Sequence, residues 1–300
     1  MVEFDEIFKK ESSKMITLSI CRAGDITVLK PVIKLIESHD IRCHLIDDRP
    51  KLECLLDSMG QTELLESNLF IHHITDDEEA AHSALRLIAQ GKADILVKGM
   101  VPTATLLREV LKKEHGVVES TMLSHVALFE PPNYHKALLL SDAAMNIAPD
   151  LEQKKQIINN TAEAAQMLGI SKPKVALLSA VEKVTDKMPS TVDAHALVEM
   201  GTQDFKYDII MEGPLQYDLA ISKKAAAQKE VQSEVAGDAD ILIAPNIEAG
   251  NILYKSLVYS AGARVASVLT GARVPIVLTS RADSPEDRFN SINLAMALSK

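Results

Sequence analysis

The chain has 300 residues, of which 47% are hydrophobic and 25% are charged, a composition typical of globular proteins. A chain of this length can bury two cores of medium size, and we expect two domains. Its net charge of -10, from 32 basic and 42 acidic residues, argues against a nucleic-acid or anionic-membrane surface.

The cysteine content and the chain start predict the compartment. Cys21, Cys43 and Cys54 are odd in number and form no CxxC pair, so we expect neither a disulfide framework nor a zinc site. The N-terminus carries mixed charge without an apolar signal segment, and no apolar run approaches the roughly 18 residues of a membrane span. We therefore expect a cytoplasmic protein without membrane or nucleic-acid partners.

Apolar runs of strand length alternate with segments of helical periodicity along most of the chain, which predicts an α/β protein with mostly parallel sheets. We expect strands at residues 16–20, 41–46, 69–74, 94–97, 126–129, 137–140, 175–178, 209–211, 241–244 and 274–278. We expect helices at residues 28–36, 80–88, 106–111, 156–168 and 252–259.

One stretch interrupts the parallel pattern. Between Leu123 and Leu140, two apolar runs flank the polar turn of residues 130–134, which predicts an antiparallel hairpin. The composition then shifts at residues 148–150, where Asp150 and Gln153 have the spacing of a capping box at the start of a helix. We place a domain boundary near this point.

Ligands of open α/β sheets bind beyond the carboxyl ends of the strands, so polar residues that follow strands are the candidates for function. In one such loop, Lys98 ends a strand and Thr103 opens a helix. Free N–H groups there could hold a phosphate oxygen, with Lys98 or Arg108 adding positive charge. Ordinary N-capping by the hydroxyls explains the same residues, and no P-loop motif decides between the two.

The predicted hairpin supplies a second group of candidates. Ser124 and His125 open one of its strands, and Asn146 follows the other. His125 could polarise a substrate carbonyl, but a histidine beside a sheet is also a common structural residue.

A third group follows the strand at 241–244. Asn246, Glu248 and Asn251 lie at a turn before a helix, and Gly250 permits close approach of another backbone segment. The same polar residues also suit an ordinary helix entry, so the sequence leaves both functions open.

The last candidates lie near the end of the chain. Ser284, Pro285 and Asp287 have the spacing of a capping box with proline in the first turn. Arg281 precedes them and has no evident structural task. From these residues alone, Asp287 is either a helix cap or a catalyst.

Four stretches carry a resemblance to a known family: "KGMVPTATLLREVL", "LLLSDAAMNIAPDLEQK", "SEVAGDADILIAPNIEAGNILYKSL" and "VPIVLTSRADS". Together they resemble the phosphate acetyl/butyryltransferase family, in detail most closely its butyryl branch. The resemblance runs from about Ala93 to the C-terminus, and it is specific because several motifs occur in the family's order.

The resemblance implies two α/β domains of the isocitrate/isopropylmalate dehydrogenase-like type, with the active site in the cleft and a homodimer or larger homo-oligomer. The first domain would comprise residues 1–145 and 270–300, and the second residues 146–269. The implied reaction is reversible acyl transfer between butyryl-CoA and phosphate, giving butyryl phosphate and CoA. Coenzyme A is then a substrate, and no metal or permanently bound cofactor is expected.

The resemblance also implies catalytic residues. In the acetyltransferase branch a Ser-Arg pair is followed, six residues after the arginine, by an aspartate proposed as the base; here these are Ser280, Arg281 and Asp287. The residues between them differ from that branch. Acetyltransferases also have an arginine just before the serine that matches Ser124, and this chain has Leu123 there, so its phosphate clamp must use other groups.

Three alternatives stay open. A phosphate acetyltransferase acting on acetyl-CoA differs by only two methylenes of substrate, about 0.8 kcal/mol each. A metal-dependent dehydrogenase of the same architecture could use Asp283 and Asp287, which stand four residues apart. A ligand-sensing domain without turnover is the third.

Overall fold

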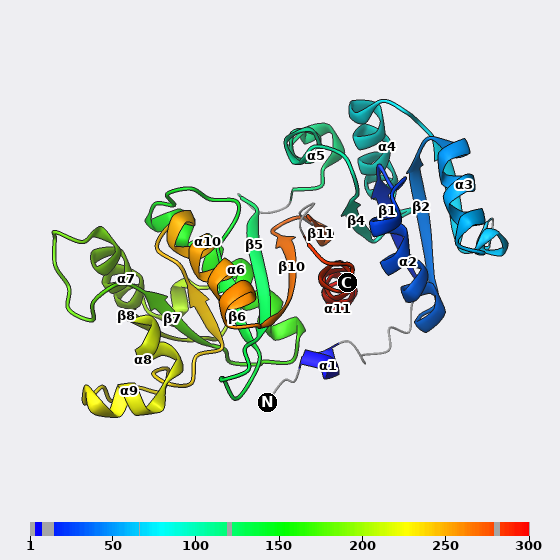
Figure 1. The fold of residues 1–300 in the computed structure, drawn as a ribbon. Helices are drawn as coiled ribbons and strands as arrows, with labels where there is room; N and C mark the ends of the chain where they lie inside the picture. Colours follow the sequence, from blue (N-terminus) through cyan, green and yellow to red (C-terminus); the bar gives the residue numbers. More distant parts are fainter. Residues whose placement is uncertain (1–3, 8–14, 66, 119–121, 279–282, 300) are drawn as a thin grey trace. The chain divides into compact units, whose positions relative to one another are not determined.

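The computed structural model describes residues 4–7, 15–65, 67–118, 122–278 and 283–299. It is a mixed α/β structure with mostly parallel strands, as the sequence predicts, and it forms two compact units. The N-terminal unit comprises Phe8–Ser120 and Ala266–Lys300, and the central unit comprises Met1–Ile7 and Thr121–Val265 (Figure 1). The hairpin after Leu123 lies in the central unit, and the domain boundaries given above stay a prediction. The isocitrate dehydrogenase-like arrangement stays a prediction.

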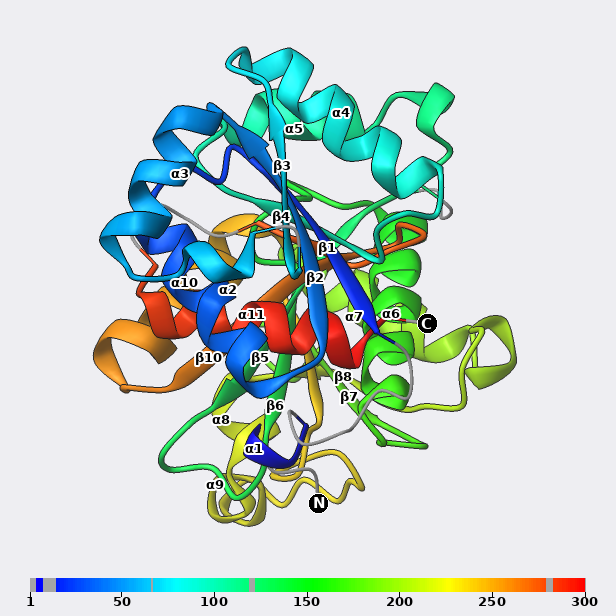
Figure 2. The same cartoon turned by 90° about the vertical axis from the view of Figure 1, so that its right-hand side faces the viewer.

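The N-terminal unit has strands in the order β3-β2-β1-β4-β11-β10, and only the β10–β11 pair is antiparallel. The strands are β1 (Ile16–Cys21), β2 (Ile41–Asp47), β3 (Leu69–His73), β4 (Ile95–Lys98), β10 (Arg264–Thr270) and β11 (Ile276–Val277). Its helices are α2 (Ile26–Ser38), α3 (Arg49–Ser58), α4 (Asp77–Ala89), α5 (Thr103–Val110) and α11 (Pro285–Ala297), with short turns η1 (Thr62–Leu64) and η2 (Lys113–His115). Helix α4 packs against α5, and α11 packs against α2 (Figure 2).

The central unit has strands in the order β5-β6-β9-β7-β8. They are β5 (Ser124–Glu130), β6 (Leu138–Ser141), β7 (Lys174–Leu178), β8 (Ile210–Leu215) and β9 (Ile241–Ile243). Its helices are α1 (Phe4–Ile7), α6 (Leu151–Met167), α7 (Pro189–Glu199), α8 (Tyr217–Ile221), α9 (Lys223–Gln228) and α10 (Ile247–Lys255), with η3 (Thr202–Asp204) and a π-helical turn η4 (Ser256–Ser260). The β5–β6 pair is antiparallel, which confirms the predicted hairpin.

Helix starts follow the predicted capping chemistry. Asp150 and Gln153 form a reciprocal capping box at α6, as the sequence predicts. Helix α4 begins with Asp76 as its cap. Its first turn carries three further carboxylates, whose negative charge interacts favourably with the positive end of the helix dipole. No helix in the described part of the chain is long and apolar enough to cross a membrane.

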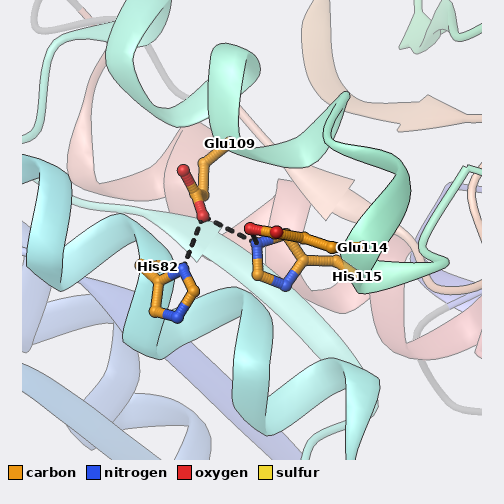
Figure 3. Close-up of side chains that lie close together, drawn as sticks. All are labelled: His82, Glu109, Glu114 and His115. Atoms are coloured by element: carbon orange, nitrogen blue, oxygen red, sulfur yellow. Dashed lines mark hydrogen bonds and ion pairs between the residues drawn. The ribbon is translucent and has the colours of Figure 1, made fainter.

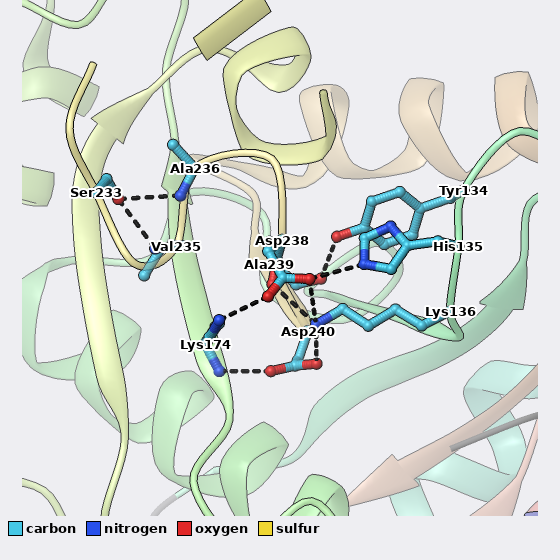
Figure 4. Close-up of polar contacts among 10 residues, drawn as sticks. All are labelled: Tyr134, His135, Lys136, Lys174, Ser233, Val235, Ala236, Asp238, Ala239 and Asp240. Atoms are coloured by element: carbon cyan, nitrogen blue, oxygen red, sulfur yellow. Dashed lines mark hydrogen bonds and ion pairs between the residues drawn. The ribbon is translucent and has the colours of Figure 1, made fainter. Parts of the chain in front are cut away.

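A cluster of charges closes the amino-terminal edge of the central sheet (Figure 4). The carboxylate of Asp238 lies 2.6 Å from Lys174 Nζ and 2.7 Å from His135 Nε2. Lys136 Nζ lies 2.5 Å from Asp240 Oδ1 and donates to the Asp238 carbonyl. Burial favours the protonated acid of Asp238, but its cationic neighbours outweigh burial and hold its pKa well below the usual range. The cluster connects the starts of β7 and β9 at this edge of the sheet.

We expect Asp238→Asn to lower the free energy of unfolding by about 1–3 kcal/mol at pH 7, because it removes charge-assisted hydrogen bonds. The folded-state pKa lies below the ordinary value of about 3.9, so this stabilisation is present above that pH and is lost as the pH falls through the folded-state pKa. Urea unfolding from pH 7 to pH 2 measures the difference. Asp208→Asn, which breaks an exposed pair with Lys172, is the matched control and should cost under about 1 kcal/mol. Equal losses in the two variants would contradict the prediction.

Candidate active site

Asp142 directly follows β6, and its buried carboxylate accepts four hydrogen bonds. Oδ1 accepts from the backbone N–H groups of Ala144 at 2.8 Å and Met145 at 2.9 Å. Oδ2 accepts from the backbone N–H of His125 at 3.1 Å and from Asn146 Nδ2 at 2.5 Å. Because β5 runs antiparallel to β6, the start of one strand and the end of the other meet at this carboxylate.

Further polar contacts fix the start of β5. Asn146 Nδ2 also donates to the carbonyl of Leu123 at 2.9 Å. Asn160, on α6, donates to the Ser124 hydroxyl at 2.9 Å. The structure thus brings together Ser124, His125 and Asn146, which the sequence analysis selected from two separate segments.

The His125 ring is buried, and among the described residues its Nδ1 has no hydrogen-bond partner. Burial is the main cause that lowers its pKa; Lys255 acts in the same direction and Asp142 opposes them. The ring is therefore neutral at pH 7, and it packs against Tyr254 with 5.8 Å between ring centroids. A neutral imidazole can donate or accept a hydrogen bond to a substrate without adding a charge to the site.

The start of α10 adjoins this cluster. Asn246 is the N-cap, and its Oδ1 accepts from the backbone N–H of Ala249 at 3.0 Å. Asn251 Nδ2 donates to the carbonyl of Ala143 at 3.0 Å, within the loop that follows β6. Glu248 is exposed in the first turn of the helix. Two of these three candidates therefore have structural hydrogen bonds, and binding of substrate by any of them stays a prediction.

Two glycines are required by close backbone approach. A Cβ at Gly250 would lie 2.3 Å from the Asp142 carbonyl oxygen, so α10 can pack against this loop only through glycine, as the sequence predicts. In the N-terminal unit, a Cβ at Gly99 would lie 2.1 Å from the carbonyl oxygen of Arg22. Gly99 directly follows β4, at a strand end of the kind where ligands of α/β sheets bind, and Gly250 lies within α10.

The start of α5, after the loop that follows β4, is not capped in the way that the sequence suggested. Pro102 is the N-cap of α5 and no side chain caps the helix, so the capping explanation of Thr103 is wrong. Thr103 is exposed, while Lys98 is buried and donates to the carbonyl of Gly99 at 3.2 Å. Arg108 pairs with Glu78 at 3.2 Å on the surface. Anion binding by Thr103 and Arg108 stays a prediction.

The sequence analysis missed Arg22 and Asp47. Arg22 Nη1 lies 2.5 Å from Asp47 Oδ1, and its Nε lies 2.8 Å from Asp77 Oδ1. Asp47 Oδ2 also accepts from the backbone N–H of Gly24 at 2.8 Å. Both residues stand at the carboxyl ends of strands, so the rule that selected the other candidates also points to them. Together they hold the loop that follows β1.

Asp287 is a helix cap in the structure. Its Oδ2 accepts from the backbone N–H of Ser284 at 3.1 Å and from the Ser284 hydroxyl at 2.8 Å, and its own N–H donates to that hydroxyl at 3.1 Å. The predicted capping box at α11 is confirmed. Ser280 and Arg281 lie outside the described residues.

The family model described as "Phosphate acetyl/butaryl transferase" matches residues 70–296. The chain belongs to this family. It is 45% identical to the probable phosphate butyryltransferase of Bacillus subtilis, over 99% of this chain and 97% of that protein. It is 42% identical to the phosphate acetyltransferase of Thermotoga maritima, over 73% of this chain and 74% of that protein.

A solved structure agrees with the family assignment. The branched-chain phosphotransacylase of Enterococcus faecalis V583 superposes with a TM-score of 0.86 at 39% identity, over 95% of this chain and 99% of that chain. The chain is therefore a phosphate acyltransferase, and the dehydrogenase alternative is not favoured. These relatives are named for butyryl, acetyl and branched-chain transfer, so the family does not fix the acyl group.

Proposed function

We propose that the chain transfers a butyryl group reversibly between coenzyme A and phosphate, giving butyryl phosphate and CoA. The observation that carries the proposal is the 45% identity to a probable phosphate butyryltransferase along nearly the whole chain. We also propose that it acts in the cytoplasm as a homodimer or larger homo-oligomer, with CoA as a substrate and no permanently bound cofactor.

We assign the base to Asp287. In the direction of thioester synthesis, its carboxylate takes the proton of the CoA thiol while the sulfur attacks the acyl carbon. The carbon–sulfur bond forms, the bond from the acyl carbon to the phosphate oxygen breaks, and phosphate leaves with the electron pair. A carboxylate is a much weaker base than a thiolate, so proton transfer has to accompany the attack. Among the described residues the capping bonds use Oδ2, and we assign Oδ1 to accept the proton.

The phosphate and the developing oxyanion need donors. Arg281 suits them because its planar guanidinium can give two parallel hydrogen bonds to phosphate oxygens. Ser280 and the α5 start at Thr103 supply further donors, and Arg108 adds positive charge on the same helix.

The side chains of Ser124, His125 and Asn146, which the structure gathers around Asp142, would bind the acyl end of the substrate. His125 would donate to the acyl carbonyl, which its neutral ring allows, and Ser124 and Asn146 would hold the strand ends around it. Asn246, Glu248 and Asn251, at the start of α10, would contact the polar part of the substrate.

We expect kcat/KM to be higher for butyryl-CoA than for acetyl-CoA, by about tenfold if both extra methylenes are buried in the transition state. A thiol-release assay with phosphate and acetyl-, propionyl-, butyryl- and isobutyryl-CoA measures the series. A higher kcat/KM for acetyl-CoA would support the phosphate acetyltransferase alternative. No turnover of any thioester would overturn the proposed function itself and favour a ligand-sensing domain.

A further inference from the structure

A second constellation of reactive side chains lies in the N-terminal unit, and none of its four side chains has a role assigned above. His82 on α4, Glu109 on α5, and Glu114 and His115 on η2 point toward one another (Figure 3). One ligand atom from each of the four lies within 4.8 Å of the others. We call these four residues the His82 cluster.

The geometry of the cluster centres on one carboxylate oxygen. Glu109 Oε1 lies 2.8 Å from His82 Nδ1 and 2.6 Å from His115 Nε2. Glu114 Oε1 lies 3.8 Å from the same nitrogen of His115. Two imidazole nitrogens thus converge on a single oxygen from two different elements of the fold.

Burial gives the cluster a closed side and an open side. The side chains of Glu109 and His115 are only 7% and 5% exposed, whereas that of His82 is 48% exposed and that of Glu114 is 62% exposed. A cavity of about 270 Å³ is lined by His82, Glu109 and neighbouring residues of α4 and α5. The ligand atoms can therefore be reached from solvent on the side of His82 and Glu114.

The second oxygen of the Glu109 carboxylate has a partner of its own. Lys112 Nζ lies 2.6 Å from Oε2, the oxygen that does not face the histidines. With an ion on Oε1, Lys112 would keep its partner and orient the carboxylate, as residues behind metal ligands do.

Two imidazoles with one or two carboxylates form a ligand set that zinc and similar borderline ions prefer. Without an ion, hydrogen bonds between the two imidazoles and Glu109 satisfy the same atoms. In the ion-bound state, the ion would replace the imidazole protons that make these hydrogen bonds. Zinc–nitrogen bonds are about 2.0–2.1 Å long, so two ligand atoms of a tetrahedral ion lie roughly 3.3 Å apart. Glu109 Oε1 would therefore have to move away from the two histidine nitrogens to admit the ion, and the exposed Glu114 would have to turn toward it.

We propose that the His82 cluster is a binding site for one divalent transition ion of the zinc class, ligated by His82 Nδ1, His115 Nε2, Glu109 and Glu114. The ion would link α4, α5 and η2 within the N-terminal unit. None of the four ligands is assigned to the transfer reaction, although Arg108, which we assign to the phosphate, lines the same cavity.

Calorimetric titration of chelator-treated full-length protein with Zn²⁺ tests the site. We expect one ion per chain with a Kd at or below about 10 µM at pH 7, weakening in acid because the ligands must be deprotonated. Cobalt(II) in place of zinc should give the strong visible absorption of a four-coordinate ion. His82→Gln with His115→Gln should raise the Kd at least about 100-fold and abolish this absorption.

The matched control is His44→Gln with His72→Gln, which removes the other close histidine pair, whose ring nitrogens lie 3.0 Å apart. That pair belongs to no group of three or more metal-ligating side chains in the described residues, so Zn²⁺ affinity should be unchanged. If the His82/His115 double variant fails to fold, the exposed His82→Gln alone should raise the Kd at least about tenfold. Binding weaker than about 100 µM in the parent, or equal binding in parent and His82 variants, would overturn the site.

Discussion

Asp287→Asn should slow turnover by at least about 100-fold while the protein melts within a few degrees of the parent. Asparagine keeps the shape of aspartate and one oxygen, so it can still accept from the N–H and hydroxyl of Ser284. The cap contributes about 1 kcal/mol or less, and asparagine loses only part of that. As a base, however, the carboxylate has no substitute in an amide. Steady-state kcat with butyryl-CoA and phosphate, beside a thermal melt, measures both effects.

Ser284→Ala is the matched variant, because it removes the other half of the same capping box. It should lower stability by about 1 kcal/mol and keep most of the activity. A parallel binding measurement should show that Asp287→Asn still binds CoA, which separates catalysis from binding. Near-normal turnover of the asparagine variant would leave Asp287 as a cap and nothing more.

The sequence predicted elements well where burial imposes a clear pattern. In β1 every residue except Thr17 is buried, and in β2 buried apolar residues alternate with Arg42 and His44 before the buried end of the strand. Strand β10 was missed because Ala266 and Ser267 interrupt its apolar run at Arg264–Thr270. Helix α3 was missed because only Leu52 and Leu56 are buried on it, too few to give a helical pattern.

The candidate site was predictable in part. The rule on strand ends selected Asn146 in the loop that follows β6, and the predicted hairpin drew attention to His125 at the start of β5. Neither could show that Asp142 holds them both, since that depends on the antiparallel register of β5 and β6. The His82 cluster could not be predicted from the sequence for a similar reason. His82 and Glu109 are far apart in sequence, and only the packing of α4 on α5 brings them together.

Asp142→Ala should lower the free energy of unfolding by about 3–5 kcal/mol, the largest stability change we expect at the candidate site. The carboxylate is 3% exposed and accepts from four donors. Alanine leaves all four without this acceptor, and each buried donor left unpaired costs about 1–3 kcal/mol before water or relaxation repairs part of the loss. Urea unfolding at pH 7 measures the change.

Asp142→Asn should fall between parent and alanine, because the amide has one oxygen and the two pairs of donors use different carboxylate oxygens. Ala144 and Met145 share Oδ1, whereas the His125 N–H and Asn146 share Oδ2, so an amide nitrogen must face one pair. Asp150→Asn is the control: Asp150 caps α6 in an exposed position, asparagine caps as well as aspartate, and the loss should stay within about 0.5 kcal/mol. An Asp142→Asn variant as stable as the Asp150→Asn control would mean that the carboxylate does not hold the two strand ends together.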